Sequence, residues 1–349
     1  RNVTSFDVLI ITTAHHPQDG RLIRHQACLE RHGFKSHIHA IASSNRLQRF
    51  LISPIKAYKA IKHYKPKCIL LPDPELHLLF PPLLRNQVAV ISDIHEDYQQ
   101  VQLDRTWIKF GLKYLVRSAL KVTEKIRSRY SHCVITADIN VYPHADFEIT
   151  NFPHPSDLPP PTANSQAKDF IYVGDIRKSR GLAMMLDLTE EISGMNLHLV
   201  GPAKQIDLNQ VIADRGLEHR VIWHGRKDYR SSWELAQSCL AGLCLLENTE
   251  AFRYAHPTKI WEYWAVGIPV LATPLPGQSQ MIKKVGAGIA ADYSQLKETI
   301  QEWIDSPLKA QNLGSKGRSH VHVGSTERDL KLPQAVRLSL DKFSRLSGT

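Results

Sequence analysis

The feature that most constrains the fold of this chain is a repeated alternation of short apolar stretches with amphipathic ones. Phe6–Thr12 and Val88–Ser92 are typical of buried strands, whereas Arg21–His32 has the spacing of a helix that ends at Gly33. Strands that alternate with helices indicate a parallel sheet, because parallel neighbours need a crossover connection. The same alternation starts again at Phe170. The sequence therefore predicts an α/β protein with two doubly wound parallel-sheet domains.

A proline-rich break separates the two series. Residues 153–168 contain three consecutive prolines followed by small polar residues, which is the composition of an interdomain linker. We accordingly expect a first domain at residues 1–152, a second at 169–330, and a last helix at 331–349 that packs back on the first domain. Two doubly wound domains predict a cleft lined by the carboxyl ends of their strands.

The composition is that of a soluble globular protein with an uneven charge. Of the 349 residues, 42% are hydrophobic and 22% are charged, and no run of 18 apolar residues predicts a membrane span. No signal peptide is visible and the five cysteines are scattered, so we expect a cytoplasmic protein with reduced thiols. Residues 1–150 contain 21 Lys and Arg against 13 Asp and Glu, which gives +8 of the net charge of +10. This half favours an anionic partner: a membrane surface, a nucleic acid or an acidic acceptor.

The segment from His256 to Thr273 reads as a short helix followed by a buried strand. Pro257 suits the first helical position, so the free amides of Thr258 and Lys259 would point off the helix N-terminus, where anions bind. Lys259 adds a positive charge there, and Glu262 shares its helix face. A diphosphate at the helix start and a carboxylate that accepts hydrogen bonds from vicinal hydroxyls would fit a nucleotide sugar. The alternative is an ordinary α/β unit with a solvated Lys and Glu.

A basic loop follows the first strand of the second series. It runs from Gly174 to Gly181 and contains Arg177, Lys178 and Arg180. The loop matches neither the Gly-x-Gly-x-x-Gly pattern of dinucleotide sites nor a Walker A loop. Its cations could neutralise a pyrophosphate, because the loop lies at the ligand edge of the predicted sheet. The alternative is a solvated basic loop.

Polar residues also follow the strands of the first series. His95 comes after Val88–Ser92 and is the leading candidate of this half. A weaker set of candidates for the cleft or the acceptor side comprises Asp19, Arg21, Asp73, Asp93 and Glu96. Without other evidence, a histidine in such a turn is more often structural than functional. Asp19 and Arg21 could line the cleft, but an ion pair within the domain is an equally good interpretation of these two residues.

A basic stripe occupies residues 105–129, where a Lys or Arg recurs at every fourth position. It begins with Arg105, Lys109, Lys113 and Arg117, and Trp107 and Phe110 lie beside it. A basic amphipathic helix with aromatic side chains is typical of binding to an anionic membrane surface. The alternative is a core-packed helix with a solvated basic face. Nucleic acid is a weaker interpretation, because no nucleic-acid-binding motif accompanies the charge.

Four segments resemble glycosyltransferase family 4, in the same order along the chain. They are Asp19-Gly20-Arg21-Leu22, Asp93-Ile94-His95-Glu96-Asp97-Tyr98, Val173-Gly174 through Arg180-Gly181, and Pro257-Thr258-Lys259-Ile260-Trp261-Glu262-Tyr263. The second segment is similar to the Asp-Val-His-Glu-Asp-Tyr of one bacterial branch. The resemblance covers about residues 6–305. It implies the GT-B fold, in which two Rossmann-like domains face a cleft, and an enzyme that retains anomeric configuration.

The resemblance also implies roles for single residues. His95 would contact the donor sugar, with Asp93 or Glu96 orienting its ring. Arg180 would contact the diphosphate, and Glu262 would bind the donor ribose.

The chain departs from the family at two positions. Many relatives carry an arginine where this chain has Asp175, so Arg177 or Lys259 would supply the second charge. Relatives commonly carry another glutamate eight positions before Glu262, where this chain has Tyr254. Tyr254 or backbone amides would then take over the contacts of that glutamate near the sugar hydroxyls.

The combined expectation is a metal-independent, retaining hexosyltransferase. It would move a sugar from a nucleoside-diphosphate sugar to an acceptor hydroxyl, with a lipid-linked or cell-envelope saccharide as the favoured acceptor. The protein would lie on the inner face of the cell membrane, with no cofactor and no metal, because the chain has no Asp-x-Asp of the metal-dependent transferases. Arg180 and Lys259 would stabilise the departing diphosphate. The rival hypotheses are a nucleotide-sugar epimerase of similar fold and a non-catalytic binding or assembly protein.

Overall fold

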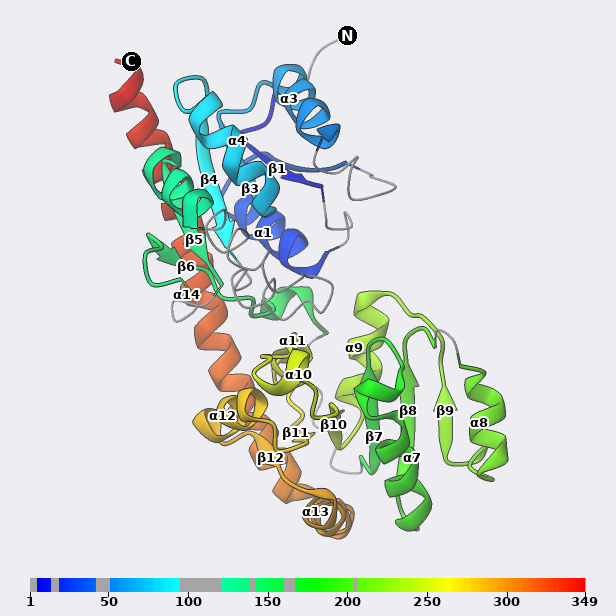
Figure 1. Ribbon diagram of the computed structural model, residues 1–349. Coiled ribbons are helices and arrows are strands. Elements are labelled where there is room, and N and C mark those ends of the chain that lie inside the picture. The colour runs from blue at the N-terminus through cyan, green and yellow to red at the C-terminus, as the bar shows by residue number, and fades with distance from the viewer. Residues whose placement is uncertain are drawn as a thin grey trace. The chain divides into compact units, whose positions relative to one another are not determined.

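The chain consists of two compact units. Residues 1–151 and 326–349 form the first unit, and residues 152–325 form the second. The computed structural model describes residues 5–13, 19–41, 51–94, 121–137, 142–159, 167–203 and 206–348. Figure 1 colours both units along the chain.

The first unit is built on a six-stranded parallel sheet. Its strand order is β2-β1-β3-β4-β5-β6. The strands are β1 (Val8–Thr12), β2 (Ser36–Ala40), β3 (Cys68–Leu71), β4 (Ala89–Ile94), β5 (Cys133–Thr136) and β6 (Phe147–Glu148). β1, β3, β4 and β5 are buried along their whole length, as expected for a parallel sheet covered on both faces.

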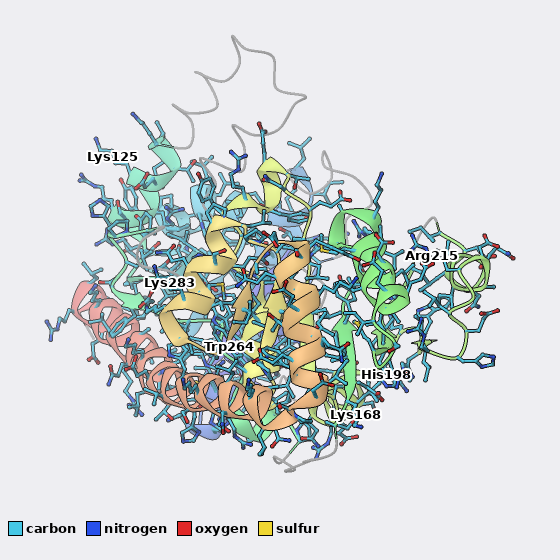
Figure 2. The ribbon with its side chains drawn as sticks, turned by 90° about the horizontal axis from the view of Figure 1, so that it is seen from below. Lys125, Lys168, His198, Arg215, Trp264 and Lys283 are labelled. Carbon is cyan, nitrogen blue, oxygen red and sulfur yellow. The ribbon has the colours of Figure 1, made fainter. Side chains whose placement is uncertain are left out.

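Helices cover both faces of this sheet. One hydrophobic cluster includes α1 (Gly20–Arg31) and Leu332, Ala335 and Val336 of the last helix, α14 (Pro307–Ser347). The opposite cluster includes α3 (Ser53–Tyr64) and α4 (Pro74–Leu84). Residues 121–130 are also helical, and Figure 2 labels Lys125 in this stretch. Two clusters on opposite faces of one parallel sheet confirm the doubly wound architecture predicted for this half.

The second unit repeats this plan. Its parallel sheet has the strand order β12-β11-β10-β7-β8-β9. The strands are β7 (Asp169–Val173), β8 (Asn196–Val200), β9 (Val221–Trp223), β10 (Ala241–Cys244), β11 (Val270–Ala272) and β12 (Gly288–Ala290). The helices are α7 (Leu182–Glu191), α8 (Leu208–Asp214), α9 (Tyr229–Gln237), α10 (Glu250–Arg253), α11 (Thr258–Ala265), α12 (Pro276–Val285), α13 (Tyr293–Asp305) and the first part of α14. Two 3-10 turns, η1 (Pro155–Asp157) and η2 (Lys178–Arg180), complete the unit.

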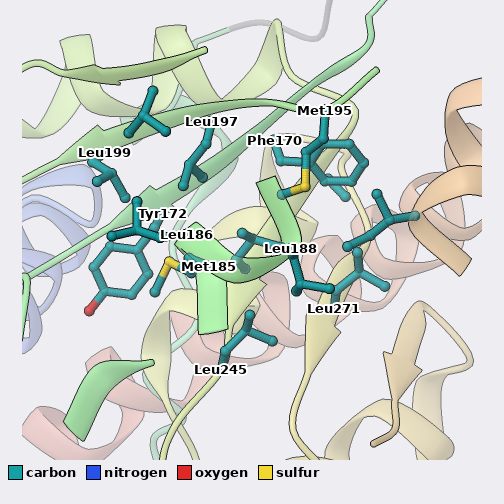
Figure 3. Close-up of a cluster of buried hydrophobic side chains, with 14 of the residues drawn as sticks. Phe170, Tyr172, Met185, Leu186, Leu188, Met195, Leu197, Leu199, Leu245 and Leu271 are labelled. Atoms are coloured by element: carbon teal, nitrogen blue, oxygen red, sulfur yellow. The ribbon is translucent and has the colours of Figure 1, made fainter. Parts of the chain in front are cut away.

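The core of the second unit forms between β7, β8 and α7. Phe170 and Tyr172 of β7 and Leu197 of β8 contact a cluster that includes Met185 and Leu188 of α7 (Figure 3). These side chains are fully or almost fully buried. Burial on this scale contributes roughly 1.5–3 kcal/mol for each large apolar side chain. The packing fixes β7, and with it the loop that follows β7.

A buried cluster of three charged or titratable groups joins the elements of the first unit. The Arg21 guanidinium donates two hydrogen bonds to the Asp93 carboxylate, at 2.9 and 2.6 Å, and one to the carbonyl oxygen of Ile149 at 2.9 Å. The His25 Nε2 atom lies 3.1 Å from an Asp93 oxygen. Burial would raise the pKa of Asp93, but the charge of Arg21 and the contact with His25 hold that pKa well below its usual range. Burial, together with the charge of Arg21, lowers the pKa of His25 to about 4.

We predict that His25 makes the protein sensitive to mild acid. The unfolded imidazole titrates near 6.5 and the folded one near 4, so the stability from neutral His25 is present above pH 6.5 and is lost as the pH falls toward 4. The loss is on the order of 3 kcal/mol. Urea unfolding at pH 7 and pH 4.5 should show a smaller loss of stability for His25→Gln than for wild type. The control is His219→Gln, which removes an exposed imidazole; identical pH dependence in all three proteins would contradict the prediction.

Candidate functional site

The strand order of the second unit places a ligand edge between β7 and β10. β8 and β9 lie on one side of β7, whereas β10, β11 and β12 lie on the other. The connections therefore reverse direction between β7 and β10, and ligands of open α/β sheets bind outside the carboxyl ends of the strands at such a point. The residues that follow these two strands are Gly174 and Leu245.

The loops after β7 and β10 are in direct contact. The Glu247 amide donates a hydrogen bond to the Ser179 carbonyl oxygen at 3.1 Å. Gly181 has φ +86°, and a methyl group added to it would lie 2.0 Å from the Leu245 carbonyl oxygen. Only glycine fits this approach, so packing explains the glycine at position 181.

The helix α11 begins at this edge. Pro257 has an extended backbone (ψ 122°) and is the N-cap residue, so the helix begins at Thr258 and the prediction of Pro257 as its first residue was wrong by one position. The amides of the first turn still lack partners within the helix, as at any helix N-terminus. The helix ends at Ala265, and Gly267 follows with φ +86°, a backbone conformation that favours glycine after a helix.

Lys259 is the unusual side chain of this edge. It is only 9% exposed, and its Nζ atom lies 3.8 Å from the centroid of the Tyr172 ring. A methyl group at Gly174 would lie 2.9 Å from the same Nζ atom. Among the described residues, no group accepts a hydrogen bond from this ammonium. The ring face of Tyr172 attracts the cation, but it leaves the three N–H donors without acceptors.

Arg180 is the second cation of the edge. Its guanidinium carbon lies 4.9 Å from the centroid of the Phe252 ring. Burial raises the pKa of the Cys244 thiol, at the end of β10, to about 11, while the charges of Lys259 and Arg180 oppose the rise. Both cations are therefore within electrostatic reach of the same strand end, although they are separated by 79 positions in the sequence.

Arg177 differs from the two cations at the edge. Its guanidinium is exposed and forms an ion pair with the Asp175 carboxylate at 2.5 Å. Of the two residues expected to supply a second charge, Arg177 is thus already paired, whereas Lys259 lies beside Gly174.

Glu262 lies one helical turn after Lys259 and is partly exposed. It accepts a hydrogen bond from the Tyr229 hydroxyl at 3.1 Å. Tyr229 begins α9, which packs against α11 in the fold. The two residues are 33 positions apart, and no local spacing predicts their contact. Tyr254, the residue in place of a family glutamate, is 69% exposed and directly follows α10.

The cleft candidates of the first unit have structural partners. Asp19 is the N-cap of α1 and accepts hydrogen bonds from the Arg21 and Leu22 amides. Asp73 is fully buried and accepts hydrogen bonds from the Thr12 hydroxyl at 2.8 Å and the Thr13 amide at 2.6 Å, which joins the ends of β1 and β3.

The ion pair expected for Arg21 exists, but its partner is Asp93 and not Asp19. Asp93 contacts Arg21 and His25. His95 and Glu96, which follow it, lie outside the described residues, as do Arg105, Trp107, Lys109, Phe110, Lys113 and Arg117.

No group of three or more His, Cys, Asp or Glu among the described residues could hold a metal ion. No helix within the same residues is long and apolar enough to cross a membrane.

Solved structures share the fold of the whole chain. HepE from Anabaena, in complex with UDP and glucose, has a TM-score of 0.66 at 14% identity, with 94% of this chain and 98% of that chain covered. Sucrose-phosphate synthase from Thermosynechococcus elongatus has a TM-score of 0.66 at 16% identity, with 95% and 98% covered. WaaG, a glycosyltransferase involved in lipopolysaccharide biosynthesis, has a TM-score of 0.61 at 12% identity, with 93% and 99% covered. At these identities the likeness establishes the fold, which is GT-B, as the resemblance of the four sequence segments implies.

The sequence itself matches a family over the second unit. Residues 156–320 match the family described as "Glycosyl transferases group 1". A comparison with curated proteins finds no match. The matched segment contains Gly174, Arg180, Lys259 and Glu262, and thus the whole edge between β7 and β10. This match, on a GT-B fold, identifies the chain as a glycosyltransferase.

Proposed function

We propose that this glycosyltransferase belongs to family 4 and transfers a sugar from a nucleoside-diphosphate sugar to an acceptor hydroxyl, with retention of configuration and without a metal. The observation that carries the proposal is the buried Lys259 ammonium, which lies at the N-terminus of α11 beside Gly174 and has no acceptor among the described residues. Burying a cation without a partner costs several kcal/mol, so folding alone gives no reason to keep it. An anion bound at the helix N-terminus would supply the missing acceptors.

A diphosphate fits this edge better than a single carboxylate. Lys259 and Arg180 bring two positive charges to one strand end, and the first amides of α11 add donors there. The guanidinium of Arg180 can donate two parallel hydrogen bonds to phosphate oxygens. We assign the diphosphate to Lys259, Arg180 and the amides of Thr258 and Lys259.

Glu262 is assigned to the ribose of the donor. It lies on the same helix as Lys259 and one turn further along, so a nucleoside attached to the diphosphate would extend toward it. Its carboxylate can accept hydrogen bonds from both ribose hydroxyls. The Tyr229 hydroxyl holds one Glu262 oxygen and thereby orients the carboxylate.

Uridine is the first nucleoside to test. HepE has been crystallised with UDP and with UDP-glucose, and a TarM variant has been crystallised with UDP. These ligands belong to those proteins, at identities of 14–16%. These ligands make UDP the first nucleotide to test, but they do not indicate which sugar this chain transfers.

The proposed chemistry relies on charge alone. Negative charge grows on the diphosphate as the glycosidic bond breaks, and Arg180 and Lys259 would stabilise it without a divalent cation. The departing phosphate would accept the proton of the acceptor hydroxyl on the same face of the sugar, which retains configuration. His95 is proposed to contact the donor sugar. The acceptor is proposed to be a lipid-linked or cell-envelope saccharide, used by an enzyme peripheral to the inner face of the membrane.

We predict opposite effects of Lys259→Met on binding and on stability. Methionine has a similar volume and no charge, so the unliganded protein should be at least as stable as wild type. UDP at 100 times its wild-type Kd should stabilise wild type by about 2.7 kcal/mol and the variant by almost nothing. Thermal unfolding with and without UDP measures both effects, and Lys178→Met, which removes an exposed cation of the loop after β7, is the control. A destabilised variant that binds UDP normally would show that Lys259 is a structural residue.

We predict that Glu262→Ala weakens binding of UDP by about 10- to 100-fold, because a charge-assisted hydrogen bond contributes roughly 1.5–3 kcal/mol. Tyr229→Phe should weaken it less, since only the orientation of Glu262 is lost. Isothermal titration calorimetry gives both values. Glu234→Ala, on the exposed side of α9, should bind like wild type. Equal Kd values for Glu262→Ala and wild type would exclude the ribose contact.

We predict that Arg180→Gln lowers kcat for donor hydrolysis by about 10²- to 10³-fold, more than it weakens UDP binding, because its charge acts mainly on the departing diphosphate. EDTA should leave the wild-type rate unchanged. NMR of the transferred sugar should show the anomer of the donor. A rate that disappears in EDTA and returns with Mg²⁺ or Mn²⁺ would refute the metal-free mechanism.

A further inference from the structure

One face of the first unit is formed by three neighbouring helical stretches: α3, α4 and residues 121–130. The connections from β2 to β3, from β3 to β4 and from β4 to β5 run in the same direction across the sheet, so right-handed crossovers place them on one face (Figure 1). Lys62 of α3 donates a hydrogen bond to Gln87, after α4, at 3.2 Å. Arg85, also after α4, donates one to the Arg129 carbonyl oxygen at 2.7 Å. α4 therefore lies between the other two.

The outward side of α4 is entirely apolar. The exposed residues of this helix are Leu78, Leu79, Pro82 and Leu83, and the three leucines are 42%, 47% and 56% exposed. A surface helix normally carries polar residues on that side, because only its inner stripe needs to be apolar. Ile55 of α3 and Val122, on the two neighbouring helical stretches, are also exposed apolar residues, at 57% and 55% exposure.

Rows of cations flank the apolar strip. On α3, Lys56, Lys59 and Lys62 are exposed, and the helix contains no acidic residue. In residues 121–130, Lys121, Lys125 and Arg129 are exposed, and Figure 2 shows Lys125 pointing outward. The acidic residue of α4, Glu75, is buried and hydrogen-bonded to the Thr13 hydroxyl. We name this surface, comprising the four exposed α4 residues and the six cations, the α4 face.

We infer that the α4 face docks on an anionic lipid bilayer. The leucines would enter the boundary between headgroups and acyl chains, and the two rows of cations would contact lipid phosphates. The inference rests on the proposed function, in which the acceptor is held at a membrane. It assigns the contact to residues 55–83 and 121–129 and does not require the basic stripe of residues 105–117.

The chemistry of the α4 face favours a bilayer over a protein. Protein interfaces are enriched in aromatic residues and Arg, whereas Lys is depleted there. The α4 face carries aliphatic side chains and five lysines among its six cations. A second copy of this chain would place cation against cation, which repels. A bilayer requires no matching of individual charges, so lysines that form no ion pair with the described residues, around a short apolar strip, suit it.

Vesicle binding by matched variants tests the inference. The full chain is sedimented with vesicles of phosphatidylglycerol and phosphatidylcholine, or of phosphatidylcholine alone. Leu79→Asn with Leu83→Asn should reduce binding to the anionic vesicles at least tenfold without a change in net charge. Leu308→Asn with Val323→Asn, at exposed apolar positions of α14, should bind like wild type. Equal binding by both double variants would overturn the inference.

Charge reversal tests the cationic rows separately. Lys56→Glu with Lys59→Glu should lower binding to anionic vesicles at least tenfold, since each basic residue near such a surface contributes about fivefold. Lys283→Glu with Lys284→Glu changes the net charge equally at exposed positions of α12 and should have a much smaller effect. Equal losses in the two pairs would mean that only net charge matters, which would also overturn the inference.

A single labelled cysteine tests insertion directly. All five native cysteines are buried, so Leu79→Cys provides an accessible thiol for an environment-sensitive fluorophore. Its emission should shift to shorter wavelength with anionic vesicles, and the same label at Leu308→Cys should not shift. An unshifted label at position 79 on sedimenting protein would refute insertion of α4.

The test is independent of the donor site. Hydrolysis of a soluble donor should be unchanged in the Leu79→Asn and Leu83→Asn variant, because neither residue belongs to the edge between β7 and β10. A protein that binds vesicles through the α4 face but no nucleotide would refute the proposed function and keep the docking surface. A protein that binds nucleotide but no anionic vesicle would refute the docking surface and keep the proposed function.

Discussion

The interaction on which the candidate donor site depends is the contact between the Lys259 ammonium and the ring of Tyr172. The ring is itself fixed, because Tyr172 belongs to a buried strand and its hydroxyl donates a hydrogen bond to the Asp175 carbonyl oxygen at 2.8 Å. A cation–π contact offsets part of the cost of burying the charge, but it cannot replace oxygen acceptors. The site therefore keeps a cation oriented and poorly solvated before any ligand arrives. This is the preorganisation that electrostatic stabilisation of a leaving group requires.

Charged groups at the sheet edge of the first unit are neutralised by each other, whereas no described group neutralises the Lys259 ammonium at the edge of the second unit. For this reason the diphosphate is assigned to the second unit. In the first unit, Arg21 and Asp93 neutralise each other, and Asp73 is held by groups from β1. These charges are satisfied within the fold. In the second unit, no described group accepts a hydrogen bond from the Lys259 ammonium, and the nearby ion pair between Arg177 and Asp175 is exposed to solvent.

The sequence predicted the sheets and the helices because burial on both faces leaves a strong pattern of apolar strands. It also predicted that Lys259, Arg180 and Glu262 share an edge, since each lies next to a strand end or on the helix that follows one. It did not predict the partners of these groups. The choice of Asp93 over Asp19 for Arg21, and of Tyr229 for Glu262, depends on how helices distant in sequence pack together, and no local spacing encodes that packing.

Net charge alone would have given a misleading account of where anions bind. The first half carries +8, yet its described sheet edge contains the neutralised Arg21–Asp93 pair, and the six cations of the α4 face lie on helical stretches beside the one that carries the exposed leucines. The second half carries 23 Lys and Arg against 21 Asp and Glu, which leaves only +2, yet it holds the buried Lys259. A small anion such as a diphosphate responds to one or two desolvated charges at short range, because a low local dielectric strengthens them. A bilayer responds to the summed charge of an exposed surface. The two kinds of anion thus require different arrangements of the same residue types, and this chain carries one arrangement in each unit.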